Sequence, residues 1–243
     1  MDSAETAGDR LNGWQQRIGA TRYAATVKAR PAKGGGRWVS VPPERLQRWI
    51  DGFADRHGPF ESTGDDHVVR LAAADGALAE CHAPFPPLPQ GAPRVADLVT
   101  HARAERLVGV VLVRLGGYAA GVFHGSRLIA SKVDSRYVQG RTAAGGWSQQ
   151  RFARRRQNQA EQTYQAAADT ALRVLSPHLD GMAAVVFGGD RKAVDLMRAE
   201  RRLAPLFALE AEPFLTVPDP RLAVLQETPA QFRAVRIHVT DPR

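Results

Sequence analysis

The sequence predicts a mixed α+β protein in which a β-sheet flanked by helices follows a smaller α+β domain. Apolar runs joined by glycine turns fill residues 106–135, and segments with helical spacing alternate with further apolar runs after them. A proline-rich stretch, "PFPPLPQGAP" at 84–93, precedes this part and is typical of a linker. We therefore expect a partly ordered segment over 1–35, a small domain over 36–92 and a larger domain over 93–243.

The small domain is predicted to contain a strand, a helix and a hairpin. The run "RWVSV" at 37–41 favours a strand, and the prolines that follow it favour a helix start. Gly58 is suited to end that helix, and the Asp75-Gly76 pair is typical of a hairpin turn. Four apolar side chains recur at helical spacing between these signals: Leu46, Trp49, Ile50 and Phe53.

The larger domain is predicted to alternate strands and helices around one mixed sheet. Gly116-Gly117 favours a hairpin turn, and Asp190 is suited to cap a helix. A helix from about Gln149 to Leu175 carries one apolar stripe, formed by Ala153, Ala160, Tyr164, Ala167, Ala171 and Leu175. The expected order is a helix at 95–105, strands at 106–115, 118–124 and 126–135, a glycine loop at 136–147, the long helix, a strand at 182–189, a helix at 190–203 and a closing strand at 232–240.

Composition narrows the class of partner. The 243 residues carry a net charge of +8, which favours a polyanion such as nucleic acid. The single cysteine, Cys81, excludes a disulfide framework and a multi-cysteine zinc site, and we expect it to be a packed thiol. The histidines show no metal-ligand spacing, so we expect neither a metal nor another cofactor. No apolar run is long enough to span a bilayer and the start lacks a signal-peptide layout, so we expect a cytoplasmic protein. We also expect it to be a monomer.

The stretch "AAGGWSQQRFARRR" at 143–156 carries the candidate chemistry. Gly145 and Gly146 allow the backbone to approach a ligand, and Ser148 stands where a helix N-cap belongs. Gln149 and Gln150 then occupy the first helical turn. Five arginines and no acid lie between residues 141 and 156, which suits phosphate binding, and they are Arg141, Arg151, Arg154, Arg155 and Arg156. The plainer alternative is a glycine loop followed by a solvated helix face.

The run "GGWSQQRFARRR" resembles the signature of the class I translation termination factors of eukaryotes and archaea, in which Gly-Gly-Gln precedes Arg-Phe-Ala-Arg. Here "RFAR" stands at 151–154, and the resemblance extends over about residues 98–240. Trp147 occupies the place of the glutamine of that family, and the glutamine comes two residues later, in "WSQ" at 147–149. A glutamine displaced in this way resembles the loop of the Vms-like release factors of actinobacteria. The resemblance implies an RNase H-like release-factor catalytic domain.

The resemblance also implies a function. A Vms-like release factor would be a codon-independent peptidyl-tRNA hydrolase that releases nascent chains in ribosome-associated quality control. Its partners would be the large ribosomal subunit, ribosomal RNA and peptidyl-tRNA. Gln149 would be the catalytic amide, with Gln150 as the rival, and Trp147 would stack on a base or pack against the loop. Two alternatives stay open: a metal-independent endonuclease that cuts the tRNA acceptor end, and a non-catalytic rescue module that binds the ribosome or RNA. A metal-dependent nuclease built on Asp134 and Asp180 is disfavoured for want of an acidic cluster.

Overall fold

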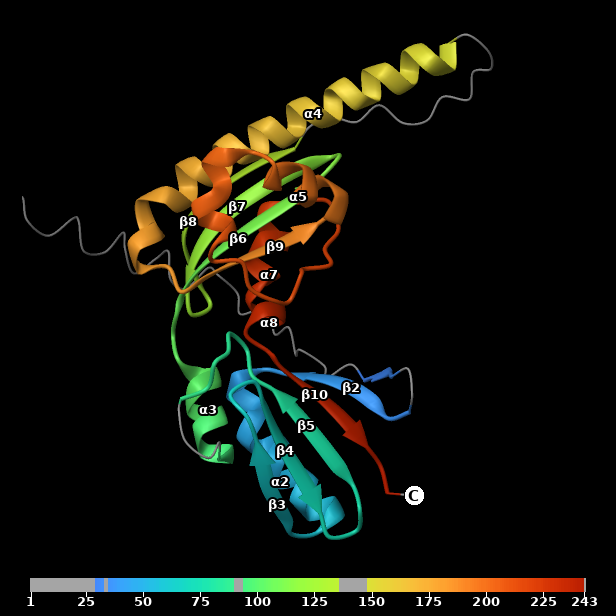
Figure 1. Ribbon diagram of the computed structural model, residues 1–243, viewed down its shortest axis with the longest axis vertical. Helices are drawn as coiled ribbons and strands as arrows, with labels where there is room; N and C mark the ends of the chain where they lie inside the picture. Colours follow the sequence, from blue (N-terminus) through green and yellow to red (C-terminus); the bar gives the residue numbers. More distant parts are fainter. Residues whose placement is uncertain (1–28, 33–34, 90–93, 136–147, 243) are drawn as a thin grey trace, which may run out of the picture.

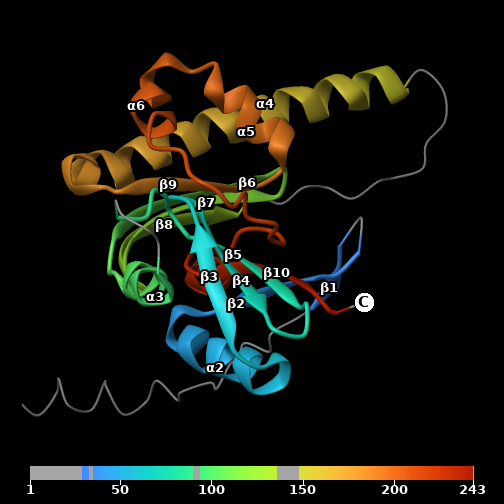
Figure 2. The ribbon, with the colours of Figure 1, turned by 60° about the horizontal axis from the view of Figure 1, so that its bottom comes forward.

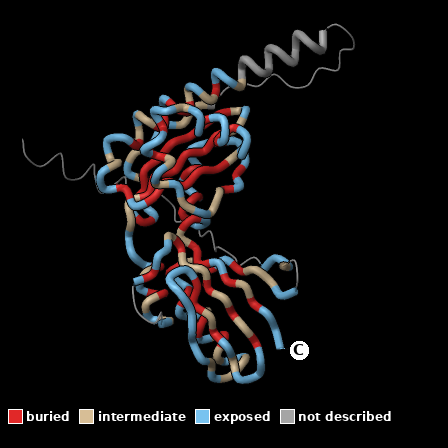
Figure 3. Tube along the Cα trace, viewed as in Figure 1, coloured by how far each residue is buried: buried red, intermediate tan, exposed pale blue. Residues whose placement is uncertain are grey.

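The protein contains two β-sheets, one at each end of the molecule in Figure 1. The computed structural model describes residues 29–32, 35–89, 94–135 and 148–242. In Figure 3 the tube is mostly red along the central strands of the second sheet, whereas red alternates with tan and blue along the first sheet; each sheet has its own buried core. The predicted class, mixed α+β with helices beside the sheets, is confirmed. None of the described helices is both long and apolar enough to cross a membrane.

The first sheet is antiparallel, and its strand order is β1-β2-β10-β5-β4-β3. The predicted strand at 37–41 and the hairpin around Asp75-Gly76 are confirmed as β2 and β4–β5, and Gly76 has a φ of 93°. The strands are β1 Arg30–Pro31, β2 Arg37–Val41, β3 Phe60–Gly64, β4 Val68–Ala73, β5 Leu78–His82 and β10 Val235–Thr240.

One face of this sheet is covered by α2 (Leu46–His57) and α3 (Val95–Arg103). The helix predicted after Pro43 is confirmed as a 3₁₀ turn, η1 (Pro43–Arg45), that continues into α2. Leu46, Ile50 and Phe53 are its buried side chains, and Gly58 ends it with a φ of 84°. Alternate residues of β2, β4, β5 and β10 complete the core because successive side chains of a strand point to opposite faces.

The closing strand, β10, corrects the prediction that it ends the second sheet. It lies between β2 and β5 of the first sheet. Its buried residues alternate with Arg236, His238 and Thr240, so the strand suits a sheet with one open face. In the second sheet β6 is already paired on both sides, with β7 and β9. The domain boundaries at 36–92 and 93–243 stay a prediction.

The second sheet has the order β8-β7-β6-β9, with β6 and β9 parallel and the other pairs antiparallel. Bridges from Val185 to Glu210 and from Gly188 to Leu215 add a parallel segment beside β9. The predicted strands are confirmed as β6 Leu107–Arg114, β7 Gly117–His124, β8 Arg127–Ser135 and β9 Ala184–Gly189.

Helices cover both faces of the second sheet (Figure 2). The long helix α4 (Ser148–Leu175) and α5 (Arg191–Arg198) pack on one face, and α7 (Leu222–Glu227) and α8 (Pro229–Phe232) pack on the other. Gly109 of β6 lets α4 end close to the sheet, because a Cβ there would lie 2.6 Å from Leu175 Cδ2. Three short elements complete the order: η2 (Ser176–Gly181), η3 (Arg201–Leu203) and α6 (Ala204–Phe207).

Candidate functional site

The predicted site residues lie, in the sequence, at the start of α4 and just before it, mostly beyond what the structure describes. Arg141, Gly145, Gly146 and Trp147 lie outside the described residues. The helix itself is confirmed, since its backbone begins at Ser148, one residue before the predicted start. The side chains of six further site residues, Gln149, Gln150, Arg151, Arg154, Arg155 and Arg156, lie outside the described part as well. Their roles stay predictions.

The backbone of α4 shows where this segment stands relative to the fold. The helix has 28 residues, which corresponds to a length of about 42 Å. Thr163 is the first of its described residues to be buried, so roughly 20 Å of helix precede it. Figure 1 shows the N-terminal end of α4 extending past the end of the second sheet, while its C-terminal half lies across the strands. The helix therefore holds its first turns away from the main body.

Small side chains seat the C-terminal half of α4 on the sheet. Within the predicted stripe, Ala167, Ala171 and Leu175 are buried, and Ala160 and Tyr164 are half-buried. The stripe is confirmed over 160–175, whereas Ala153 lies outside the residues whose side chains are described. Three further buried positions, Thr163, Ala168 and Thr170, widen it. Because most of these side chains are small, the helix axis can approach β7 closely.

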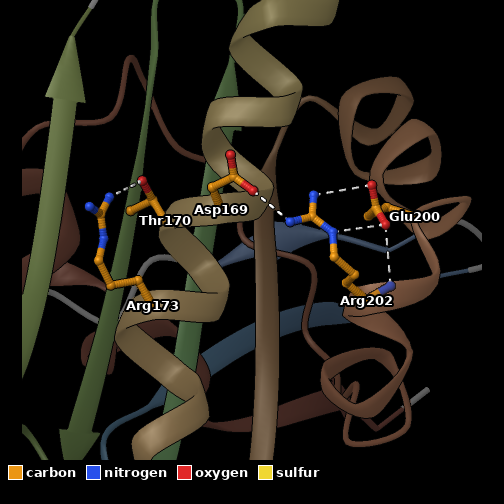
Figure 4. Close-up of polar contacts among 5 residues, drawn as sticks. All are labelled: Asp169, Thr170, Arg173, Glu200 and Arg202. Atoms are coloured by element: carbon orange, nitrogen blue, oxygen red, sulfur yellow. Dashed lines mark hydrogen bonds and ion pairs between the residues drawn. The ribbon is translucent and has the colours of Figure 1, made fainter.

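An ion-pair cluster joins the same half of α4 to the turn after α5 (Figure 4). Arg202 donates from Nη1 to Asp169 Oδ1 at 2.9 Å and from Nε to Glu200 Oε1 at 3.2 Å. On α4 itself, Arg173 Nη2 donates to Thr170 Oγ1 at 3.2 Å. Hydrogen bonds from Arg202 hold the pKa of the Glu200 carboxyl below its usual range, so this acid stays ionised beside the guanidinium.

A groove of about 610 Å³ runs between α4 and α5 beside the cluster. Its α4 wall spans 160–168 and its α5 wall includes Lys192 and the exposed side chain of Leu196. Asp190 lines it too and caps α5, as predicted, by accepting from the Lys192 N–H at 3.0 Å. Burial and the Asp190 carboxylate raise the pKa of Tyr164, so the phenol faces the groove in its neutral form.

Asp134 and Asp180, the two acids considered for a metal-dependent nuclease, lie in separate elements of the fold. Asp134 accepts a hydrogen bond from the Tyr118 hydroxyl at 3.0 Å across β7 and β8. Asp180 lies in η2, beyond the C-terminal end of α4. In the part of the chain that the structure describes, no three histidines, cysteines or carboxylates are grouped closely enough to hold a metal ion.

Comparison with known proteins gives one family. The model of the Actinobacteria/chloroflexi VLRF1 release factor family (acVLRF1) matches residues 106–238, which include the glycine loop, α4 and α5. That match covers more than half of the chain. No curated protein matches the sequence.

Among solved structures, the archaeal translation termination factor aRF1 is 15% identical with a TM-score of 0.40, over 81% of this chain and 66% of that one. Dom34 from S. cerevisiae, a translation termination-like factor involved in RNA quality control, is 9% identical with a TM-score of 0.33, over 83% of this chain and 66% of that one. This chain therefore spans just under two thirds of the length of either.

Proposed function

This chain belongs to the Actinobacteria/chloroflexi VLRF1 release factor family, and on that basis we propose that it is a codon-independent peptidyl-tRNA hydrolase. Its substrate would be the ester that joins a nascent peptide to the terminal adenosine of tRNA in a stalled ribosome or large subunit. The observation that carries the proposal is the family match over residues 106–238, which contain both the Gly-Gly loop and the arginine-rich start of α4. We propose that the protein acts as a monomer in the cytoplasm, where its substrate lies.

The long helix α4 supports the proposal by the position of its first turns. Burial of Ala167, Ala171 and Leu175 fixes the C-terminal half of α4, while the first turns extend past the sheet (Figure 1). A ligand much larger than this protein, such as a ribosomal subunit, can then receive the start of the helix without meeting the sheet. The arginines of those turns would bind RNA phosphates through bidentate contacts and fix the position of the loop.

The chemistry we propose is water-mediated ester hydrolysis. Gln149, an uncharged amide, would orient the attacking water by a hydrogen bond, and backbone N–H groups of Gly145 and Gly146 would approach the oxygen that gains charge. Water attacks the carbonyl carbon, the bond from that carbon to the ribose oxygen breaks, and the ribose oxygen takes up a proton. The products are a free peptide acid and an intact tRNA. An amide is no base at neutral pH, so proton transfer would fall to groups of the ribosome and tRNA.

The test uses purified large subunits that carry peptidyl-tRNA labelled on the peptide and at the RNA 3′ end. We expect free peptide and an unshortened RNA. Replacing Gln149 by Ala is expected to slow release roughly 100-fold, the usual scale for removing one oriented donor. Gln226→Ala is the matched control, because this exposed glutamine lies in α7 on the opposite face of the sheet.

Each alternative gives its own result in this experiment. A shortened RNA 3′ end would show an endonuclease, and subunit binding with both labels unchanged would show a non-catalytic rescue module. If Gln149→Ala retained full release while Gln150→Ala lost it, the proposed reaction would stand and the rival residue would be the catalytic amide.

A further inference from the structure

The first sheet carries an aromatic and basic surface on the face opposite α2 and α3. In Figure 1, β2, β10 and β5 lie side by side with α2 behind them, and the register pairs confirm that order. Even-numbered residues of β2, β5 and β10 point away from the core, because Val39, Val41, Ala79, Cys81, Val235, Ile237 and Val239 are buried in it. We call four of these residues the tryptophan face: Trp38, His82, Arg236 and His238.

Trp38 is the centre of this face. Its ring centroid lies 5.0 Å from that of His238, its direct partner on β10, and 5.2 Å from that of His82 on β5. The guanidinium carbon of Arg236 lies 5.0 Å from the centroid of the Trp38 ring. Three rings and one cation from three adjacent strands therefore form one contiguous patch, and Arg236 is exposed at its surface.

Arg236 differs from the neighbouring basic residues in lacking an acidic partner. Arg70 pairs with Glu80 at 3.2 Å, His238 lies 3.5 Å from the same carboxylate, and Arg37 pairs with Asp241. Among the described residues, Arg236 has no carboxylate within ion-pair distance, and its contact is the indole ring. Burial lowers the pKa of His82, so this imidazole is neutral near pH 7 and adds an aromatic face without a second charge.

We propose that the tryptophan face binds a single-stranded segment of RNA. Unpaired bases stack on aromatic side chains displayed on a sheet, and a free guanidinium binds the phosphate between them. A base would stack on the Trp38 ring, and Arg236 would move from the indole to the backbone phosphate. The paired bases of a duplex are stacked on one another and cannot stack on the Trp38 ring. An acidic protein surface would pair with Arg236 but has no bases to stack on the aromatic rings. The inference goes beyond the proposed function, since none of these four residues lies near α4.

The experiment measures binding of a fluorescein-labelled 12-nucleotide oligouridylate to the full chain by fluorescence anisotropy. Trp38→Ala is expected to weaken binding at least ~5-fold, the lower end for one lost stacking contact. Trp38→Phe keeps an aromatic ring and is expected to stay near wild type. Arg236→Gln is expected to weaken binding and to reduce the slope of log affinity against log salt by about 1. Arg48→Gln, which removes an exposed charge from α2 on the covered side of the sheet, is the matched control.

The arginines at the start of α4 are also expected to bind RNA. The proposal is therefore tested by the difference in affinity between each variant and the wild type, not by the affinity of the wild type itself. The Trp38→Ala effect should be absent with a 12-base-pair RNA duplex, because a duplex offers no base to the ring. Thermal unfolding of each variant separates a binding loss from a folding loss.

Three results would overturn the proposal. In the first, Trp38→Ala and Arg236→Gln bind the oligouridylate like the wild type. In the second, the two variants bind the oligouridylate like the wild type but lose binding to large subunits, which would show that this face contacts the subunit through something other than single-stranded RNA. In the third, RNA binding is unchanged while residues 1–28 become sensitive to protease, which would identify that segment of this chain as the occupant.

Discussion

Arg202 and Asp169 join the turn after α5 to the C-terminal half of α4 through an N–H···O bond of 2.9 Å between Nη1 and Oδ1. Both side chains are more than half exposed, at 55% and 59%. Ion pairs at such exposure contribute little to stability, because water and salt screen them. Burial of small side chains along the same helix therefore does more to seat α4 than this pair does.

Two substitutions separate these contributions. Asp169→Asn removes the charge at an exposed position, so we expect little change in the free energy of unfolding. Ala171→Leu places extra volume at a position only 1% exposed, so we expect a loss of about 1–3 kcal/mol. Urea unfolding followed by circular dichroism measures both. A loss with Asp169→Asn as large as that with Ala171→Leu would show that the ion pair seats the helix.

Periodicity and turn chemistry predicted most of the fold. The helical spacing of apolar residues in α2, the Asp75-Gly76 turn and the apolar runs of β6 and β9 are all local patterns in the sequence. The edge strand β3 was missed because its residues, "FESTG", are almost all exposed and leave no hydrophobic signal. The sheet of β10 was assigned wrongly because the alternation of a strand identifies a half-open sheet but not its neighbours.

Residues brought together across long sequence separations could not be predicted from spacing. Asp169 and Arg202 are 33 positions apart, and no local pattern links them. Trp38 meets Arg236 only because β10 inserts between β2 and β5. The candidate catalytic segment is the reverse case, because its glycines, glutamines and arginines all lie within residues 141–156 and can be picked out without any tertiary contact.

The arginines at the start of α4 predict a strong salt dependence of RNA binding. Each phosphate contact releases counterions, so log affinity falls with log salt concentration. The double variant Arg151→Gln/Arg155→Gln is expected to reduce the slope by about 2. The measurement is a titration of tRNA between low and physiological salt, with Arg48→Gln as control. An unchanged slope would mean that these two side chains make no phosphate contact.

Cys81 is expected to be unreactive in the folded protein. Its side chain is 0% exposed, and burial raises the pKa of the thiol to about 12, so almost no thiolate forms near pH 8. A disulfide reagent should therefore modify Cys81 of the native protein only as fast as the fold opens around it. It should modify the unfolded protein at once. Since the chain contains no other cysteine, the absorbance of the released thiol reports this site alone. Immediate reaction of native protein would show that β5 is more accessible than its packing indicates.

His101 predicts a loss of stability on mild acidification. Its Nε2 lies 2.9 Å from the Pro84 carbonyl oxygen, and the Arg106 Nη2 lies 3.1 Å from either ring nitrogen. Burial, and then the Arg106 charge, lower the pKa of His101 against the opposing effect of the Pro84 hydrogen bond. The folded protein thus takes up its proton at lower pH than the unfolded chain, whose histidine titrates near about 6.5.

The direction in which the free energy of unfolding changes with pH follows from the protons that each state binds. Below about pH 6.5 the unfolded state binds more protons than the folded state, so the free energy of unfolding falls as pH decreases toward the folded pKa. His101→Gln, whose amide can still donate to Pro84, removes this titration and should flatten the decline. Urea unfolding from pH 8 to pH 5 measures it, with His67→Gln as the exposed control. His82, whose pKa burial also lowers, adds its own share in the same direction, so His82→Gln should flatten the curve independently. Parallel curves for the wild type and His101→Gln would show that burial and the Arg106 charge do not disfavour the imidazolium.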